Sequence, residues 1–593
     1  MVLERLFDLL PRYAETFDPK EDVLAYKEDG IWKKIDIVKY RRTVDLLSYG
    51  LLALGVKKGD TIATIMNNRP EWNYLDFAIM MVGAIHVPIY PTISKTEYQY
   101  IFNHANIRYV FVTGDEVVKK IKEVVKNCPS TQEIIVIKGK NGERNLSDII
   151  ELGEKNPNPE AVEALKAQIK TGDLATIVYT SGTTGNPKGV MLSHSNLISN
   201  FTLVSYIPTF GQEGKALSFL PLCHVYERML NYMYHYLGIS IYYAESLATI
   251  SENIKEIQPD MMCCVPRLLE KIYDKLISTG RKQKGIKRMI YFWAVNLADR
   301  FDVNGNNNVW YKLQHRIADK LIFAKWREAL GGNFKIIVSG SASIQPRIVR
   351  TFRGAGLPIY EGYGLTETSP VVAVTNPDHN GIKIGTVGPP MRGVKVKIAE
   401  DGEILAAGPG IMLGYYKDPE LTATVIDKDG WFHTGDIGVF EPEGQLRITG
   451  RKKEIFKTSL GKYIAPELIE NKVKESPFID NIMVVGENEK FAAALIVPDF
   501  NHLRSWCKIK GHEYTTDEEM VTLPVIKQRI GKVIDKSNAT FGAAEQIKKF
   551  DIMPKEWSIA TGELTPTLKL KRSFVTEKYK ANIEKLFAAN GRS

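Results

Sequence analysis

One segment concentrates hydroxyl, glycine and lysine residues at a spacing that suits phosphate chemistry. Residues 179–189 read Tyr-Thr-Ser-Gly-Thr-Thr-Gly-Asn-Pro-Lys-Gly and follow the strand-like run Leu-Ala-Thr-Ile-Val. Glycine lets the backbone approach a polyphosphate closely, hydroxyl and N–H groups donate hydrogen bonds, and Lys188 supplies a positive charge. No Gly-Lys-Ser/Thr ending follows, so the segment is not a Walker A loop. The residue types favour phosphate binding, with a Gly/Ser/Thr hairpin between two strands as the alternative.

Three further segments carry residue types of related chemistry. Residues 360–368 read Tyr-Glu-Gly-Tyr-Gly-Leu-Thr-Glu-Thr, residues 431–436 read Trp-Phe-His-Thr-Gly-Asp, and residues 564–572 read Leu-Thr-Pro-Thr-Leu-Lys-Leu-Lys-Arg. An aromatic face suits a purine, and a carboxylate or hydroxyl suits a hard divalent cation. Taken alone, the first of these segments is more typical of a Gly-rich turn with a buried tyrosine and an exposed acid, and the aspartate of the second is more typical of a turn residue.

The four segments, in this order along nearly the whole chain, resemble the signature motifs of the adenylate-forming enzymes. That superfamily comprises acyl-CoA synthetases, luciferases and the adenylation domains of peptide synthetases. The resemblance implies ATP and Mg²⁺ as ligands. It also implies a nucleotide site made by Thr180, Ser181, Gly182, Thr183, Thr184, Gly185, Lys188, Gly340, Ser341, Ala342, Glu361, Gly362, Tyr363, Gly364, Thr366, Asp436, Arg451 and Lys457.

The resemblance also assigns roles to individual residues. It implies that Tyr363 stacks on adenine, that Thr366 meets the α-phosphate and that Asp436 accepts the ribose hydroxyls. Thr180 and Glu367 are the implied Mg²⁺ ligands. The implied catalytic residues are Lys569, Glu367, Thr180 and Lys188.

Lys569 matches the adenylation lysine, and Lys453 falls at the position of the family's interdomain hinge. The family commonly has glycine before that lysine, whereas Leu568 stands here, as in long-chain members. Lys571 lies two residues further on and is the alternative in register.

Residues 220–229, Leu-Pro-Leu-Cys-His-Val-Tyr-Glu-Arg-Met, match the motif that flanks the acyl-binding channel. His224 and Tyr226 are therefore predicted to line an acyl and coenzyme A channel. The Met- and Tyr-rich sequence that follows can line an apolar tunnel, although such a stripe is also typical of ordinary core.

Together, the Cys223–Arg228 motif, the Thr-Pro-Thr-Leu-Lys-Leu-Lys-Arg ending and a basic insertion at 271–330 resemble long-chain fatty acyl-CoA synthetases. The implied reaction joins a fatty acid to AMP from ATP and then transfers the acyl group to coenzyme A. The alternatives are delivery to a carrier protein, a shorter or aromatic acid, or a non-catalytic membrane-associated relative.

Strand-like runs of four to eight residues alternate with helical patterns from residue 36 to about 440, which predicts doubly wound α/β architecture. With the resemblance, we expect a large N-terminal adenylation domain at 1–449, made of two α/β subdomains and a small β-barrel or sheet. A hinge at 450–453 and a smaller, mobile α+β C-terminal domain at 454–593 should follow.

The 593 residues carry a formal net charge of +9, and residues 271–330 hold 13 Lys and Arg against five Asp and Glu. Bases beside Phe292, Trp293, Trp310 and Trp326 suit contact with anionic lipid, with a solvated helical hairpin as the alternative. No nucleic-acid-binding module accompanies them. Five cysteines without a Cys-x-x-Cys pair, and no signal peptide or membrane-spanning run, predict a cytoplasmic protein or one at the inner face of a membrane.

Overall fold

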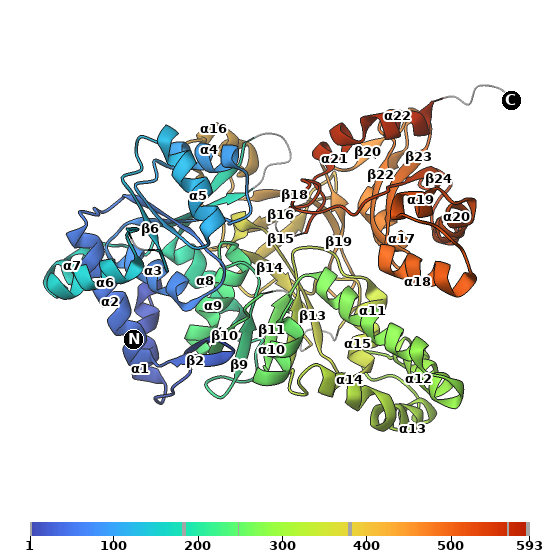
Figure 1. The fold of residues 1–593 in the computed structure, drawn as a ribbon, viewed down its shortest axis with the longest axis horizontal. Helices are drawn as coiled ribbons and strands as arrows, with labels where there is room; N and C mark the ends of the chain where they lie inside the picture. The colour runs from blue at the N-terminus through green and yellow to red at the C-terminus, as the bar shows by residue number, and fades with distance from the viewer. Residues whose placement is uncertain are drawn as a thin grey trace.

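The computed structural model describes residues 3–140, 142–180, 186–246, 248–377, 382–565 and 568–588. Figure 1 shows a large N-terminal part, blue to yellow, and a smaller C-terminal part, orange to red, against one side of it. The chain passes between the two parts after β19 (Leu446–Arg451).

Within the described chain, seven strands form one sheet in the order β17-β8-β7-β4-β3-β5-β6. The strands from β7 to β6 pair in parallel, whereas β8 and β17 add antiparallel strands at one edge. All five residues of β3 are buried, as expected of a parallel strand covered on both faces. The strands are β3 (Thr61–Ile65), β4 (Ile85–Pro88), β5 (Tyr109–Val112), β6 (Glu133–Val136), β7 (Leu174–Thr180), β8 (Lys188–Ser193) and β17 (Gly414–Tyr415).

A second sheet has the order β14-β13-β12-β11-β9-β10-β1-β2 over the described residues. Its six middle strands are parallel, and β2 and β14 pair antiparallel at the two edges. Two parallel-cored sheets confirm the predicted α/β class. The strands are β1 (Leu24–Glu28), β2 (Ile31–Ile35), β9 (Lys215–Ser218), β10 (Ser240–Tyr243), β11 (Met261–Cys264), β12 (Ile336–Ser339), β13 (Ile359–Gly364) and β14 (Val371–Val374).

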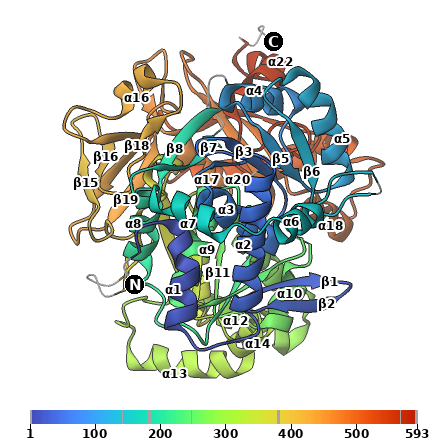
Figure 2. The same cartoon turned by 90° about the vertical axis from the view of Figure 1, so that its left-hand side faces the viewer.

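One hydrophobic core joins apolar side chains of both sheets with those of α2, α3, α8 and α9. Figure 2 shows α3 and α9 near the centre of the molecule. Helix α9 begins after His224, whose Nδ1 accepts from the Tyr226 N–H, and ends at Gly238 in the left-handed conformation that favours glycine. The helices of this region are α1 (Leu9–Thr16), α2 (Ile37–Ala53), α3 (Pro70–Met81), α4 (Lys95–Ala105), α5 (Asp115–Val124), α6 (Leu146–Lys155), α7 (Pro159–Ala167), α8 (His194–Val204), α9 (Val225–Leu237), α10 (Ile250–Ile257), α15 (Pro346–Gly354) and α16 (Pro419–Val425).

The basic insertion folds as α11 (Pro266–Lys282), α12 (Gly285–Ala298), α13 (Val309–Ala318), the π-helical turn η3 (Asp319–Phe323) and α14 (Ala324–Ala329). Its aromatics divide between core and surface. Trp326 is buried against Tyr291 and Phe323, whereas Trp310 is 67% exposed. Of the described helices, none combines the length and apolarity that a membrane span requires.

After Pro389 the chain forms a four-stranded antiparallel sheet of β15 (Lys395–Ile398), β16 (Glu403–Ala407), β18 (Phe432–Phe440) and β19, which is the small sheet expected in this part of the sequence. The short strand β17, between β16 and β18 in the sequence, does not belong to this sheet but pairs with β8 of the seven-stranded sheet. The region therefore connects the small sheet to the strand that follows the hydroxyl-rich segment.

The C-terminal part has its own hydrophobic core, which runs from Phe456 to Leu586. It contacts the N-terminal part through an ion pair between Arg267 and Asp480 and a 2.8 Å hydrogen bond from Ser343 Oγ to Glu467 Oε1. Its elements are β20 (Phe456–Lys457), β21 (Tyr463–Ile464), α17 (Pro466–Val473), β22 (Ile479–Val485), β23 (Ala492–Pro498), α18 (Phe500–Lys510), α19 (Asp517–Thr522), α20 (Pro524–Asn538), β24 (Ile547–Ile552), α21 (Arg572–Lys578) and α22 (Lys580–Phe587).

Candidate active site

A cavity of about 2530 Å³ lies where the two large sheets, the small sheet and the C-terminal part meet. Most of the residues predicted for a nucleotide and acyl site line it, although they come from segments far apart in the sequence. They are Thr180, Lys188, His224, Tyr226, Gly340, Ser341, Ala342, Glu361, Gly362, Tyr363, Gly364, Thr366, Glu367, Asp436, Arg451, Lys453 and Lys569.

An acid and a base on the small sheet and a phenol from the eight-stranded sheet form a polar wall of the cavity. Asp436 on β18 and Arg451 on β19 are direct cross-strand partners, with Asp436 Oδ1 2.8 Å from Arg451 Nε. The hydroxyl of Tyr363, from β13, donates to Asp436 Oδ2 at 2.7 Å. Burial raises the pKa of Asp436, and Arg451 and Tyr363 only partly offset this effect. The carboxylate is thus short of donors in a wall that faces the cavity, which suits binding of sugar hydroxyls.

The C-terminal part brings Lys569 to this wall. Burial within the cavity and the positive charge of Arg451 lower the pKa of Lys569, while Asp436 acts in the opposite direction. Lys569 in turn contributes to the lowered pKa of His224, across the cavity. Lys571 also lines the cavity. Lys569 therefore lies within electrostatic reach of both Asp436 and His224.

Leu568, the residue before this lysine, adopts a φ of +61°. That left-handed conformation is easy for glycine and costly for residues with a Cβ atom. The conformation gives a physical reason for the glycine that the family commonly has here. In this chain the position is occupied by leucine, which adopts this unfavourable backbone conformation.

A second cluster of polar side chains lies around Tyr415, a residue that belongs to none of the sequence motifs. Its hydroxyl donates to Glu367 Oε1 at 2.9 Å, and Lys188 Nζ lies 5.3 Å from the centre of its ring. Tyr415 therefore joins the two predicted phosphate- and metal-side residues. It belongs to the short strand β17, and only the pairing of β17 with β8 places it beside Lys188.

Thr180 and Glu367 both line the cavity and fit the part of a Mg²⁺ site that a protein supplies. Mg²⁺ bound with a nucleotide usually takes one or two protein oxygen ligands, and phosphates and water complete its shell. Among the described residues, no group of three or more His, Cys, Asp or Glu could hold a metal ion by itself. The donor set therefore suits a metal that arrives with a triphosphate.

Residues 340–342, which follow β12, and Glu361 on β13, the cross-strand partner of Ser339, form another wall of the cavity. A Cβ atom at Gly340 would lie 3.2 Å from the ring of Tyr226, so glycine allows the close approach of this ring. Burial raises the pKa of Glu361 to about 8, partly offset by a backbone hydrogen bond from Gly385 and by Arg353 and Arg447. Glu361 is therefore neutral at pH 7.

An apolar branch of the cavity extends along α9. Burial lowers the pKa of His224 to about 4, with Lys569 adding to the effect, so its imidazole is neutral at pH 7. Because its Nδ1 accepts from Tyr226 N–H at 3.2 Å, Nε2 carries the proton and can donate a hydrogen bond. Behind it the branch is lined by Val204, Ile207, Met229, Leu230, Met233 and Met261. This combination suits an acid with a long apolar tail.

Some predicted positions lie apart from this arrangement. Ser181, Gly182, Thr183, Thr184 and Gly185 lie outside the described residues. Lys457 is exposed on β20, and its Nζ is 5.3 Å from the centre of the Tyr463 ring rather than in the cavity wall. Phe456 and Ile464, its neighbours on β20 and β21, pack into the core of the C-terminal part, and Lys457 points to the exposed side, outside the cavity lining.

Both parts of the chain match known protein families. The AMP-binding enzyme family matches residues 15–416, and the AMP-binding enzyme C-terminal domain matches residues 453–591. The chain therefore belongs to the AMP-binding enzyme family, within the adenylate-forming superfamily that its motifs resemble.

Curated relatives sharpen the comparison. The chain is 34% identical to the long-chain-fatty-acid–CoA ligase FadD15 of Mycobacterium bovis, over 97% of this chain and 95% of the relative. It is 32% identical to the human long-chain-fatty-acid–CoA ligase 1, over 89% of this chain and 78% of the relative.

Solved structures share the fold. The adenylation domain of a carboxylate reductase from Mycobacterium chelonae has a TM-score of 0.77 at 21% identity, covering 99% of this chain and 91% of that one. The anthranilate CoA ligase AuaEII, in complex with anthranoyl-AMP, has a TM-score of 0.72 at 18% identity, covering 98% and 99%.

Proposed function

We propose that this chain is an AMP-forming acyl-CoA synthetase that activates long-chain fatty acids. It converts a fatty acid and ATP to acyl-AMP and pyrophosphate, and then transfers the acyl group to coenzyme A with release of AMP. One observation supports this above all. The same cavity is lined by the Asp436–Tyr363–Arg451 group with Lys569 and by the apolar residues along α9. The long-chain ligases among its relatives support the same substrate class.

The residues in the cavity suit the first half-reaction. A carboxylate oxygen attacks the α-phosphorus, the bond to the bridging oxygen breaks, and pyrophosphate leaves. A carboxylate is already a nucleophile at pH 7, so the step needs alignment and positive charge rather than a general base. Lys188 and Lys569 supply charge, Asp436 holds ribose, Tyr363 and residues 340–342 hold adenine, and neutral His224 orients the acid. Mg²⁺ held by Thr180 and Glu367 would neutralise phosphate charge.

The C-terminal part is proposed to move between the half-reactions. Lys569 and its neighbours Leu568 and Leu570 line the cavity in this arrangement, and Lys453 lies in the turn that joins the two parts. Rotation about residues 450–453 would withdraw Lys569 and open a path for the thiol. Lys453→Pro should then impair thioester formation more than adenylation, and an unchanged ratio of the two rates would remove the hinge assignment.

The test of the function is a panel of C2 to C20 acids. Fatty-acid-dependent exchange of pyrophosphate into ATP reports adenylation, and AMP release on adding free coenzyme A reports transfer. We expect both with long-chain acids. Exchange without transfer to free coenzyme A, but with transfer to a carrier protein, would establish the alternative acceptor, and failure of every fatty acid would reject the substrate class.

We also propose that the basic insertion contacts anionic membrane. Trp310, Leu313, Ile317 and Leu321, at helical spacing along α13 and η3, are 67%, 49%, 48% and 43% exposed. The exposed bases around this stripe include Lys312, Arg316 and Lys320. Figures 1 and 2 both show α13 at the rim of the molecule, where a flat surface could meet it. An apolar stripe flanked by bases suits a helix that lies in the interface of an anionic bilayer.

Sedimentation with vesicles containing phosphatidylglycerol tests this contact. The double variant Trp310→Ser, Leu313→Ser should bind several-fold more weakly than the unaltered protein, and binding should fall as salt is raised. The control variant Ile31→Ser, Val38→Ser removes two other exposed apolar side chains, 61% and 73% exposed, and should bind normally. Equal binding by all three proteins would contradict the proposal.

A further inference from the structure

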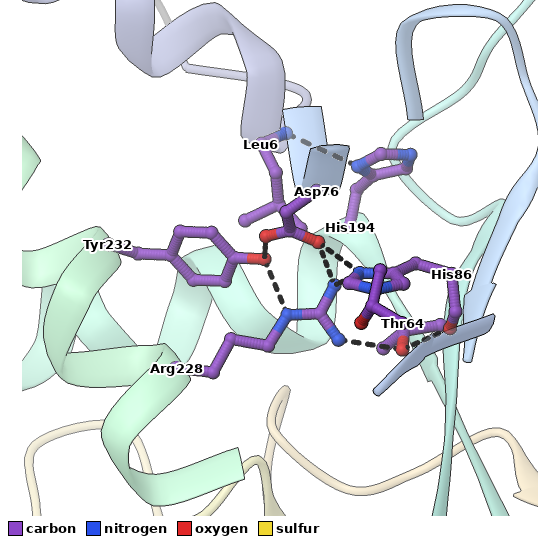
Figure 3. A network of polar contacts seen from close by, with 8 residues as sticks. Leu6, Thr64, Asp76, His86, His194, Arg228 and Tyr232 are labelled. Atoms are coloured by element: carbon purple, nitrogen blue, oxygen red, sulfur yellow. Dashed lines mark hydrogen bonds and ion pairs between the residues drawn. The ribbon is translucent and has the colours of Figure 1, made fainter. Parts of the chain in front are cut away.

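Between the two sheets lies a polar network that the reaction described above does not use. Figure 3 shows it around Asp76 and Arg228, which are 0% exposed. Asp76 on α3 accepts from Arg228 Nη2 at 2.5 Å, from His86 Nδ1 at 2.6 Å and from the Tyr232 hydroxyl at 2.5 Å. Arg228 also donates from Nη1 to Thr176 Oγ1 at 2.7 Å. One guanidinium therefore connects α3, α9 and β7.

The protonation states of this network are fixed by its partners. Burial alone would raise the pKa of Asp76, but Arg228 and His86 more than offset it, so the carboxylate is charged. Burial lowers the pKa of His86, which is therefore neutral. Since a carboxylate only accepts, Nδ1 of His86 carries the proton, and Nε2 accepts from Thr64 Oγ1 at 2.7 Å. The network holds one positive and one negative charge with every carboxylate oxygen partnered.

Helix α9 has two functional faces. Tyr226, Met229 and Met233 line the acyl branch of the cavity, whereas Arg228 and Tyr232 point into the network. The contacts that Arg228 makes in the network therefore set the distance between the cavity-lining side of α9 and the neighbouring elements. Side chains at these spacings project from different sides of one helix.

Strand β7 connects the network to the phosphate side of the cavity. Thr176 accepts from Arg228 and donates to the backbone oxygen of His86 at 2.6 Å, and Thr180, four residues on, reaches the cavity where the hydroxyl-rich segment begins. The position of the phosphates depends on β7, and the position of the fatty carboxylate depends on α9. Adenylation needs the attacking oxygen and the phosphorus at near-contact distance, and a misplacement of about 1 Å can cost about 10²-fold in rate.

We propose that Arg228 is a positioning residue that fixes the acyl-lining helix α9 relative to the phosphate-bearing strand β7 through Thr176. The proposal rests on the proposed adenylation of fatty acids. A buried ion pair is often no more stabilising than apolar residues of the same volume, so stability alone does not explain the choice of these side chains. Arginine, with donors on three nitrogens, can hold two elements and a carboxylate in one fixed geometry.

The discriminating variant is Thr176→Val, which keeps the size of the side chain and removes the acceptor for Arg228. We expect kcat for adenylation to fall about 10- to 100-fold, with KM for ATP and for the fatty acid changed less than about threefold. Synthetic acyl-AMP already joins the acyl group to the phosphate, so its conversion to thioester should stay within about twofold of the unaltered rate. A loss of fold would reduce both half-reactions together.

Three companion variants complete the test. Thr176→Ser restores the hydroxyl and should recover most of the adenylation rate, and Arg228→Lys, which lacks the forked donors, should reproduce the Thr176→Val defect. Thr61→Val is the control, because this buried threonine on β3 loses hydrogen bonds to the backbone oxygens of Ala105 and Asn106, outside the network.

The outcomes separate the two proposals. Normal adenylation by Thr176→Val, or equal loss of adenylation by Thr61→Val at matched thermal stability, would overturn the positioning role of Arg228. Equal loss of both half-reactions in Thr176→Val would overturn it as well. Absence of fatty-acid adenylation by the unaltered protein would overturn the proposed function itself.

Discussion

Two aspartate–arginine pairs, one sealed in the core and one at the cavity wall, show what distinguishes a structural carboxylate from one available to a ligand. Asp76 accepts from an arginine, a histidine and a tyrosine, and its pKa is lowered. Asp436 accepts from an arginine and a tyrosine, and its pKa is raised. Both are buried and both face arginine, so the difference lies in how far the donors compensate for lost water. The incompletely compensated carboxylate is the one that faces the cavity.

The largest effect should come from exchanging the two carboxylates for amides. Asp76→Asn leaves Arg228 buried without a counter-charge and should lower the free energy of unfolding by about 3–5 kcal/mol. Asp436→Asn removes a charge that the folded protein compensates poorly, so its unfolding should change by less than about 1 kcal/mol while AMP binding weakens at least about tenfold. Urea unfolding and calorimetric AMP titration measure the two quantities. The distinction between the two carboxylates would be wrong if Asp436→Asn unfolded more easily than Asp76→Asn, or if only Asp76→Asn lost affinity for AMP.

Lys569, the cation beside the Asp436–Arg451 pair, should give the next largest effect. Lys569→Ala should slow adenylation by about 10²-fold, roughly 3 kcal/mol, by analogy with loss of one preorganised donor to the transition state. Conversion of supplied acyl-AMP to thioester should persist, because that step does not require the lysine in this position. Lys571→Ala, two residues away on the same segment, is the matched control. A larger adenylation defect in Lys571→Ala would assign the register to that lysine instead.

Much of this fold is readable from the sequence, and the reason is local. Runs such as Thr61–Ile65 and Leu174–Thr180 are buried on both faces, so their unbroken apolar and β-branched composition marks them as central strands. Short edge strands carry no such signal. Gly414–Tyr415 has two residues, and its pairing with β8 rather than the small sheet depends on tertiary packing.

The site divides in the same way. Asp436 stands in a recognisable motif, but its direct pairing with Arg451 follows from a bulged register between β18 and β19. Asp76 and Arg228 lie 152 positions apart, on two helices that meet only when the two sheets close over them. Tyr415 has no motif of its own, and the burial of Trp326 in the basic insertion depends on the packing of α12 against η3. Long-range contacts of this kind leave no periodicity to read.

A third buried carboxylate sharpens the comparison through pH. Glu361 has a pKa of about 8, raised by burial from its ordinary value of 4.5, so between these two pH values the folded state keeps a proton that the unfolded state has released. The stability contribution of this group therefore falls as pH rises from about 4.5 to about 8 and is level above that. Glu361→Gln should flatten this slope in thermal melts between pH 5 and 9. It should also relieve a loss of ATP affinity above pH 8, where the charged carboxylate would face the nucleotide.

A parallel pH dependence in Glu361→Gln and the unaltered protein would show that Glu361 is not the titrating group. Glu227→Gln is the informative control, because burial also raises the pKa of Glu227 to about 8, yet this side chain contacts Ser218 and Asn231 away from the cavity wall. It should alter the pH dependence of stability and leave that of ATP affinity in place.

The smallest effect concerns Glu367, whose carboxylate accepts from the neutral hydroxyl of Tyr415. Tyr415→Phe removes that donor and keeps the ring beside Lys188. A hydrogen bond to a charged carboxylate contributes about 1.5 kcal/mol, so adenylation should slow about tenfold, and more Mg²⁺ should be needed for half-maximal rate as Glu367 loses its orientation. Tyr416→Phe alters the neighbouring ring, which packs against His104, and should leave the Mg²⁺ dependence unchanged. If Tyr415→Phe slows the reaction equally at every Mg²⁺ concentration, the tyrosine stabilises β17 rather than orienting the Glu367 carboxylate. The difference seen between Asp76 and Asp436, in which the carboxylate with fewer hydrogen-bond donors faces the ligand, would then not extend to Glu367.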